Sequence, residues 1–445
     1  MTLEMQKLAR SILNLADHAR QEVEVYTVSQ KALQVEVSDG QVETLREAQQ
    51  TGVGIRVIDS GRLGLAFTTR LDTESLKDVI TLAGANAQSA TADEYNILPS
   101  PRPTKPMNLL DPSMAEVPVD TKIDLARNVE KSARAYDPRV AKVRQAAYGD
   151  AIYEVGICNS RGVDVGYEGA YCSTSLLVIA EAEGQAEMGW SYDFSRSFAG
   201  LDPVKVGREA AAKAVEMLGA GSLATCRVPI LLAPDVAADF IDVLGPALTA
   251  EAVQKGKSLF AGKLGETVGS EKLNLIDSGL LPEGLDTAPV DDEGVPSQDT
   301  VILDKGVLQT YLYNCYSAAR DGVESTGNGM RASFRGALNT APRNFYIQPG
   351  NLSQSELLAK IPRGLYVTNV MGMHTANPIS GEFSVGASGL WVENGQPVRP
   401  VRGIAIAGNL VDFLKRLVAV GSDLRFFGSV GSPSLLVEGI TISGE

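Results

Sequence analysis

Six prolines within residues 99–118 set the first limit on how this chain of 445 residues can fold. Proline lacks the backbone N–H and holds φ at about −65°, so a segment this rich in proline forms neither a helix nor a central strand. We therefore expect a linker or an extended surface arm over residues 99–119. The prolines are Pro99, Pro101, Pro103, Pro106, Pro112 and Pro118.

The segments on either side of this arm follow the same order of helix, strands and helix. The first segment predicts a helix over residues 3–20, with His18 near its end, and Leu71-Asp72 begins a second helix. The predicted strands are residues 23–28, 33–37 and 54–58 in the first segment and 151–157, 163–167 and 173–183 in the second. The second segment predicts helices over 121–136 and 201–218. We interpret residues 1–98 and 120–222 as an internal duplication; chance resemblance is the alternative.

Residues 223–445 predict a domain that is mostly β. A buried strand precedes a helix that begins at Pro234, and Pro246 should kink or restart that helix. Hairpin turns are expected at Asp304-Lys305-Gly306 and, as a type I′ turn, at Asn394-Gly395. Ser353 and Glu356 form a capping-box pattern before a short helix. The fold class expected is therefore α+β, with a duplicated N-terminal α/β-sheet region followed by a mostly β C-terminal domain.

Composition excludes several classes of partner. The formal net charge of −14 argues against nucleic acid, because phosphate contacts need clustered Lys and Arg. No apolar run approaches the length of a membrane-spanning helix, and the first ten residues lack the pattern of a signal peptide. The four cysteines show no CxxC spacing, which in a reducing compartment favours buried thiols. We expect a cytoplasmic protein.

Only two histidines, His18 and His374, are available for metal binding or catalysis. A zinc helix of the H-E-x-x-H type is therefore absent, and no G-x-S-x-G elbow presents a nucleophilic serine. His374 lies in the turn-rich stretch Gly372–Pro400, where it is interpreted as a hydrogen-bonded loop residue or, alternatively, as a ligand or base.

Carboxylates give two further candidates. Asp59-Ser60-Gly61 and Asp277-Ser278-Gly279 match the short turn of aspartic proteases, but Asp-Ser-Gly is also common turn chemistry. Asp291, Asp292 and Glu293 form an acidic turn that could hold a hard cation. A solvated loop or a polar contact at a partner surface is the preferred interpretation.

Several motifs together resemble the TldD/PmbA family of bacterial and archaeal peptidase subunits. The resemblance covers nearly the whole chain, and its motifs are the G-x-G-x-R-V of Gly52–Val57, the block Ser258–Asp277, the acidic turn Asp291–Gly294, the run Asn377–Phe383 and the hairpin at Glu393–Gly395. The family has a TldD branch with a His-Glu-x-x-x-His helix and a later Cys that hold zinc. Its PmbA branch, also called TldE, lacks them and pairs with TldD.

Counting back without a gap from Ser258–Gly262, the resemblance places the positions of the family's zinc helix on Ile241, Asp242 and Pro246. Ile offers no lone pair, Pro bends the helix, and residues 426–436 contain no Cys as third ligand. The chain therefore resembles the PmbA (TldE) branch, with no catalytic residue, no metal site and no cofactor of its own.

The resemblance implies a non-catalytic subunit of a heterodimeric zinc metallopeptidase that processes or degrades unfolded peptides, with the zinc in a TldD-like partner. We expect His374, Asn377, Ser380 and Gly381, with the acidic turn Asp291–Glu293, to line the shared cleft or the partner interface. Two alternatives stay open. One is a peptidase that acts alone as a homodimer through an unrecognised site, and the other is a protein-binding regulator of the gyrase-modulator type.

Overall fold

The structure, a computed structural model, describes residues 3–16 and 21–444. The first helix, α1 (Glu4–Leu13), is shorter than the helix predicted over residues 3–20. His18 lies outside the described residues. None of the helices in the described part of the chain is long and apolar enough to cross a membrane.

Both segments that flank the proline-rich arm contribute to one six-stranded antiparallel sheet, with strand order β3-β2-β1-β4-β5-β6. Its strands are β1 (Glu22–Ser38), β2 (Gln41–Asp59), β3 (Arg62–Thr68), β4 (Val140–Asn159), β5 (Asp164–Ala182) and β6 (Gln185–Ser195). The strands predicted at 23–28 and 33–37 are wrong as separate elements, because β1 pairs with β2 over its whole length. The polar residues between those two segments are also in strand conformation, because they pair with β2. The apolar pattern alone does not reveal this pairing.

The duplication is visible in the sheet, where β1 and β4 pair at its centre and each half adds two more strands outwards. In both halves the third strand carries a glycine against which the following helix packs. A Cβ on Gly64 would lie 2.0 Å from the backbone oxygen of Ala83, and a Cβ on Gly189 would lie 2.0 Å from that of Ala210. Each half is thus a helix, three strands and a helix.

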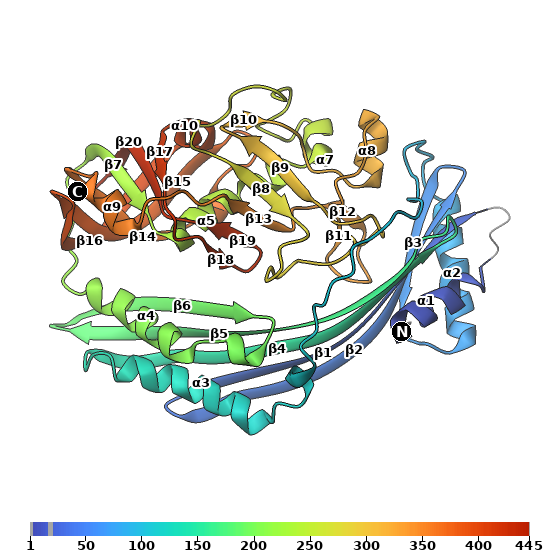
Figure 1. Cartoon of the computed structure of the whole chain (residues 1–445), viewed down its shortest axis with the longest axis horizontal. Helices are drawn as coiled ribbons and strands as arrows, with labels where there is room; N and C mark the ends of the chain where they lie inside the picture. Colours follow the sequence, from blue (N-terminus) through green and yellow to red (C-terminus); the bar gives the residue numbers. More distant parts are fainter. Residues whose placement is uncertain (1–2, 17–20, 445) are drawn as a thin grey trace.

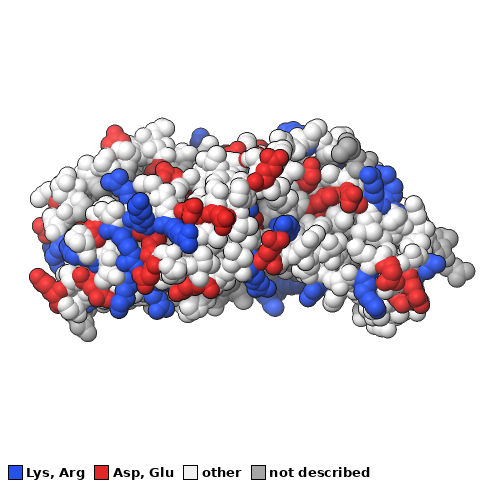
Figure 2. Space-filling model, turned by 90° about the horizontal axis from the view of Figure 1, so that it is seen from below, with Lys and Arg blue, Asp and Glu red and all other residues white. Residues whose placement is uncertain are grey.

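Helices α2 (Thr73–Gln88), α3 (Val119–Arg134) and α4 (Pro203–Glu216) complete the two halves. Asp72 and Asp202, the acidic residues of the two Leu-Asp pairs, cap α2 and α4 by accepting a hydrogen bond from a backbone N–H three residues later, at 2.9 Å in both cases. The helices lie on the outer face of the curved sheet (Figure 1). Acidic and basic side chains are interspersed over the face seen from below (Figure 2), as expected for a layer that faces solvent.

The proline-rich arm is extended apart from the 3₁₀ turn η1 (Pro112–Ala115). Asn159 donates a hydrogen bond to the backbone oxygen of Pro99 at 2.9 Å, and Leu109 forms a single parallel bridge to Gly169. The arm therefore runs along the sheet rather than hanging free.

The C-terminal region contains two further six-stranded sheets, ordered β10-β9-β8-β13-β19-β18 and β16-β15-β14-β7-β20-β17, and a two-stranded ribbon. Because β16 also pairs with β20, strands β7, β14, β15, β16 and β20 close into a ring. The strands are β7 (Cys226–Leu232), β8 (Leu275–Ser278), β9 (Asp299–Asp304), β10 (Val307–Leu308), β11 (Gly329–Arg331), β12 (Leu338–Thr340), β13 (Asn344–Ile347), β14 (Arg363–Met371), β15 (Glu382–Glu393), β16 (Gln396–Asn409), β17 (Leu417–Val420), β18 (Arg425–Phe427), β19 (Val430–Ser432) and β20 (Leu435–Ser443).

Short helices connect these strands, and the local predictions here are confirmed. They are α5 (Pro234–Asp242), α6 (Leu244–Ala247), α7 (Ala250–Gln254), α8 (Cys315–Asp321), α9 (Gln354–Ala359), α10 (Leu410–Lys415) and the 3₁₀ turn η3 (Met373–Thr375), whereas the 3₁₀ turn η2 (Phe198–Gly200) lies between β6 and α4. Ser353 and Glu356 form the capping box of α9. The turn at Asn394-Gly395 joins β15 to β16 with φ of 51° and 77°, as a type I′ turn requires. The fold is α+β.

The C-terminal region lies over the concave face of the N-terminal sheet (Figure 1). Apolar side chains from the two regions meet there, with Tyr26, Val155 and Ile157 of the sheet packed against Val290 and Phe334. The two regions therefore share a core at this contact.

Candidate functional site

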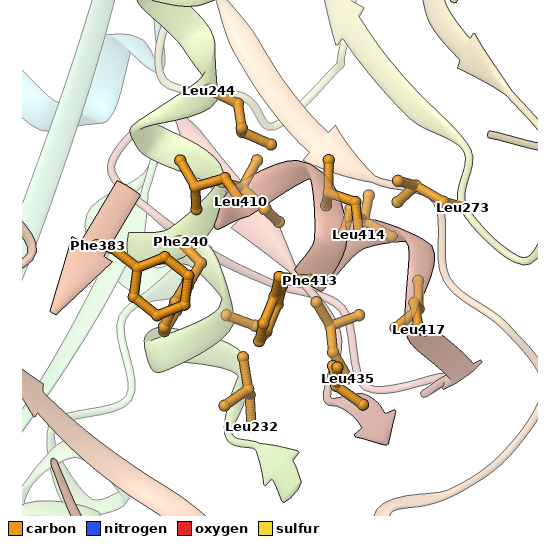
Figure 3. Close-up of a cluster of buried hydrophobic side chains, with 14 of the residues drawn as sticks. Leu232, Phe240, Leu244, Leu273, Phe383, Leu410, Phe413, Leu414, Leu417 and Leu435 are labelled. Atoms are coloured by element: carbon orange, nitrogen blue, oxygen red, sulfur yellow. The ribbon is translucent and has the colours of Figure 1, made fainter. Parts of the chain in front are cut away.

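Helix α5, which carries the zinc-helix positions of the resemblance, is anchored in the core of the C-terminal region. Phe240 stacks on Phe413 with ring centroids 4.9 Å apart, and meets Phe383 edge to face at 5.2 Å (Figure 3). The helix also packs against β18 and β19, which belong to the segment 426–436. The fold thus brings the aligned helix and the aligned third-ligand segment side by side.

The side chains at these positions do not fit zinc. Ile241 is 1% exposed and belongs to the apolar core, whereas Pro246 is exposed on α6. The helix is interrupted at Val243, between α5 and α6, because Pro246 has no N–H to donate to the backbone oxygen of Asp242. This interruption confirms the restart predicted from Pro246. Within residues 3–16 and 21–444, no group of three His, Cys, Asp or Glu side chains is placed to hold a metal ion.

A groove of about 530 Å³ runs beside α5, between the N-terminal sheet and the C-terminal region. One wall comes from β5 and β6 and includes Met188 and Trp190, whose exposed fractions are 64% and 40%. The opposite wall comes from α5 and from residues 368–371 of β14, where Met371 is 64% exposed. Large apolar side chains exposed on both walls of one groove mark a binding surface.

Strand β14 presents an unpaired edge to this groove. It pairs with β7 only at Leu365–Val367, because the chain after β7 turns away into α5. Beyond Val367, β14 has β15 on one side and, among the described residues, no strand on the other. A free strand edge can accept an extended segment through main-chain hydrogen bonds.

Acidic side chains on α5 border the groove. Burial, and after it the neighbouring carboxylates of Asp235 and Asp242, raises the pKa of Asp239 to about 6. Asp235 forms an ion pair with Lys213 of α4 across the groove, and Glu187 of β6 pairs with Arg402 of β16. These pairs join the two walls.

The loop that contains the other predicted site residues is largely exposed, and no hydrogen bond among the described residues joins it to the acidic turn. Asn377 uses its side-chain oxygen to accept from the backbone N–H of Ile379 at 2.8 Å, and Gly381 holds a positive φ of 80° in the same turn. Ser380 and Ile379 border a separate surface hollow next to α10. His374 lies on η3 with its side chain exposed. Asn377 and Gly381 therefore shape the turn, and His374 and Ser380 face outwards.

The acidic turn is not the solvated loop expected from the sequence. Asp291 and Glu293 are 0% exposed. Asp291 accepts hydrogen bonds from the backbone N–H groups of Glu293, Val295 and Gly329 at 2.8–2.9 Å. Burial, followed by the Glu293 carboxylate, raises the pKa of Asp291 above its ordinary value. Only Asp292 keeps partial exposure.

Glu293 joins the acidic turn to the N-terminal sheet. Its carboxylate accepts from Arg56 of β2 at 2.9 Å, and Arg56 also pairs with Glu24 of β1 at 2.5 Å. Glu24 in turn pairs with Arg331 of β11. Sequence reasoning missed Glu24, Arg56 and Arg331. A signal was present, since Glu24 is the one charged residue of the predicted strand 23–28 and Arg56 is the one charged residue of the predicted strand 54–58.

The two Asp-Ser-Gly turns do not form a carboxylate pair. Asp277, on β8, accepts from the side chain of Asn328 at 2.7 Å and the backbone N–H of Arg343 at 2.6 Å. Asp59 ends β2 and accepts from Gln21 at 3.2 Å. Because each carboxylate has its own donors in a different sheet, the shared proton of an aspartic protease is absent from this pair.

Comparison with protein families gives three consecutive matches. Residues 23–87 match a family model described as PmbA/TldA metallopeptidase domain 1, residues 112–218 match the central domain and residues 225–444 match the C-terminal domain. The chain belongs to the PmbA/TldD family. These three matches cover most of its length, so membership applies to the chain as a whole.

Individual members of the PmbA/TldD family align end to end with this chain. A metalloprotease PmbA homologue from Haemophilus influenzae is 30% identical over an alignment of 451 positions, which covers 99% of this chain and 96% of the relative. A crystal structure of a putative modulator of a DNA gyrase from Thermotoga maritima superposes with a TM-score of 0.91 at 31% identity, covering 98% of this chain and all of that one. The crystal structure of TldE from Thermococcus kodakarensis gives a TM-score of 0.91 at 27% identity, covering 99% of this chain and all of that one. A metallopeptidase-type role holds at the level of the family.

Proposed function

We propose that this chain is the zinc-free subunit of a two-subunit zinc metallopeptidase that processes or degrades unfolded peptides, and that a TldD-like partner holds the zinc. The observation that supports the proposal best is which residues occupy the aligned zinc positions on α5 and α6. These positions hold a core isoleucine and a helix-breaking proline, and β18–β19 beside α5 offers no thiol. A helix of this kind supports packing and leaves the metal chemistry to another chain.

The groove beside α5 supports a role in holding the peptide. A strand edge recognises main-chain groups, which every peptide has, so it suits substrates that share an extended conformation rather than a sequence. Met188, Trp190 and Met371 offer adaptable apolar contacts around that edge. The chain would thus contribute peptide binding, and the partner cleavage.

The exposed loop Gly372–Gly381 supports a role in assembly. His374, Ser380 and Ile379 are exposed, and Ile379 keeps 48% of its surface in solvent. Asn377, which is itself exposed, and the buried Gly381 hold the turn in shape. An ordered turn with an exposed apolar side chain is suited to insertion between subunits.

The test is cleavage of an unfolded peptide by this chain alone, by the TldD-like subunit alone and by the mixture, each with and without chelator. Metal content is measured on the purified chain. We expect no stoichiometric zinc in this chain and chelator-sensitive cleavage that needs both subunits. Cleavage by this chain alone would support the homodimeric peptidase and overturn the proposal. Binding of the partner without any cleavage would support a regulator instead.

Two sets of variants separate the roles of the groove and of the loop. Trp190→Ala with Met371→Ser should raise KM for the peptide severalfold and leave assembly intact. His374→Ala with Ile379→Ser should weaken assembly, measured by ultracentrifugation, and leave the free energy of unfolding of the isolated chain unchanged. Val418→Ser removes another exposed apolar side chain, on β17, and serves as the control for both sets.

A further inference from the structure

A second cavity, which we call the tyrosine chamber, lies between the N-terminal sheet and the C-terminal region and is separate from the groove beside α5. Its volume is about 300 Å³. The concave face of the sheet supplies Tyr26 from β1, Tyr153 from β4, and Tyr167 and Tyr171 from β5. The C-terminal region supplies the opposite wall, which includes Asp286, Asp292 and Arg343. This volume is that of a small-ligand site.

Two tyrosine hydroxyls in the chamber lack a partner. Tyr26 is 8% exposed, and its hydroxyl forms no hydrogen bond with any group in residues 3–16 and 21–444. The hydroxyl of Tyr167 likewise has no such bond within that part of the chain. Neither hydroxyl is among the buried polar atoms that lack a partner in the described residues, so both can be reached from the chamber and can bond a polar occupant, water included. The chamber therefore offers two hydroxyls to a polar ligand.

The walls favour a positive charge attached to an apolar body. Asp286 and Asp292 place two carboxylates on the chamber, and burial raises the pKa of both. Asp292 also accepts a hydrogen bond from the backbone N–H of Arg331 at 2.7 Å. Arg343 also lines the chamber. Its Nη1 donates to the backbone oxygen of Val290 at 3.0 Å and to Ser297 at 3.2 Å, so this nitrogen is already engaged by groups of the C-terminal region.

Aromatic rings complete this environment. Tyr153 meets Tyr167 edge to face, with centroids 6.4 Å apart and planes at 84°, and lies 6.4 Å from Tyr171. The rings therefore present both faces and edges to the cavity. Ring faces attract ammonium groups, and ring surfaces cover methylene chains. Tyrosine hydroxyls add neutral acceptors.

The sheet also provides a way in. Tyr171 borders a second, open hollow of about 400 Å³ on the concave face. Its floor consists largely of small residues from neighbouring strands, among them Ala32, Gly149, Ala151 and Ser173. Because these side chains are small, the hollow stays open as far as the larger side chain of Tyr171, which it shares with the tyrosine chamber.

We propose that the tyrosine chamber binds a primary ammonium group carried on an alkyl chain, with Asp286 and Asp292 as its charge partners and Tyr26 and Tyr167 as its hydroxyl acceptors. Two sources share this chemistry: a free alkylamine, and the lysine side chain of an extended peptide that lies along the concave face. The site does not depend on the zinc subunit, and binding can be measured on the isolated chain.

Calorimetric titration with n-pentylamine, 1-pentanol and pentanoate tests the charge preference. The three probes share one alkyl body and differ in charge, and the amine is protonated at pH 7. We expect the amine to bind at least tenfold more tightly than the alcohol, and pentanoate to bind no better than the alcohol. Equal affinities for amine and alcohol would overturn the proposal and leave the chamber as a water-filled cavity.

Variants locate the site. Tyr26→Phe removes an unpartnered hydroxyl, so folding should be preserved while amine affinity falls about threefold or more. Asp292→Asn should reduce it about tenfold, with circular dichroism as the check on folding. Tyr136→Phe, an exposed tyrosine outside the chamber, is the matched control and should have no effect. Unchanged affinity in the folded Tyr26→Phe and Asp292→Asn variants would overturn the assignment.

A pair of unfolded peptides, identical except for lysine or norleucine at one position, distinguishes the two sources. Tighter binding of the lysine peptide, competed by pentylamine, assigns the chamber to a peptide side chain. Binding of pentylamine without any preference for the lysine peptide assigns it to a free amine. Either result supports an ammonium site, and cleavage by the assembled complex tests the proposed function separately.

Discussion

Arg56 of β2 donates a hydrogen bond to Glu293 across the contact between the two regions, at 2.9 Å and over 237 positions of sequence. Both side chains are buried, and Glu24 gives Arg56 a second carboxylate. A buried ion pair is held by its complete set of partners, because removing one leaves an uncompensated charge in a medium that cannot solvate it. This cluster fixes the C-terminal region on the sheet.

The first prediction concerns this cluster. Glu293→Gln should lower the free energy of unfolding by about 3 kcal/mol, because Arg56 loses a buried counter-charge. Urea unfolding of the variant and the parent measures this loss of free energy. The control is Glu324→Gln, which breaks the exposed pair between the arm and the C-terminal region at Arg102 and should cost no more than about 0.5 kcal/mol. Similar small losses in both variants would show that the buried pair does not hold the regions together.

The second prediction concerns the contact between α2 and β3. Gly64→Ala should destabilise the protein by about 2–3 kcal/mol, because the new methyl group would lie 2.0 Å from the backbone oxygen of Ala83 and must push the helix away. Gly84→Ala, on the same helix, meets only the side chain of Gln21 at 3.5 Å and should stabilise by about 0.5–1 kcal/mol. Thermal unfolding of both variants decides it, and an unchanged Tm for Gly64→Ala would contradict the close packing.

The third prediction concerns the aligned zinc positions. Ile241→His should cost about 2–4 kcal/mol, because an imidazole would replace a side chain that is 1% exposed in an apolar core. Pro246→His, at an exposed position, should change stability by less than about 0.5 kcal/mol. The double variant should still bind no stoichiometric zinc, as measured by elemental analysis. Zinc binding with restored stability would show that the two positions can face one ion.

The fourth prediction concerns Asp239. Its folded pKa of about 6 lies above the unfolded value, so the folded protein retains a proton that the unfolded chain releases, and stability falls as the pH rises from about 4 to 6. Asp239→Asn removes this loss. Because the side chain is partly exposed and screened, the variant should be more stable by only about 1 kcal/mol at pH 8 and equal to the parent at pH 4. Asp78→Asn, on an exposed face of α2, should leave the free energy of unfolding unchanged at both pH values. A gain for Asp239→Asn at pH 4 would contradict the titration.

Local chemistry made part of the fold readable in the sequence. The turn at Asn394-Gly395, the caps at Asp72 and Asp202 and the break before Pro246 each depend on atoms within about four residues of one another, so composition and spacing are enough to predict them. The count of two histidines, His18 and His374, likewise rules out a helix of the H-E-x-x-H type, which needs both on neighbouring turns.

The sequence by itself therefore determined the α+β class and the repeated order of elements. Only the tertiary structure decided that the predicted short strands are parts of long ones, that Asp291 and Glu293 are buried, and that Tyr26 and Asp292 face one chamber. The reason is distance along the chain. Burial of Glu293 depends on Arg56, and the chamber joins β1 to residues 286–343, and no pattern within a local window reports which remote surfaces will meet.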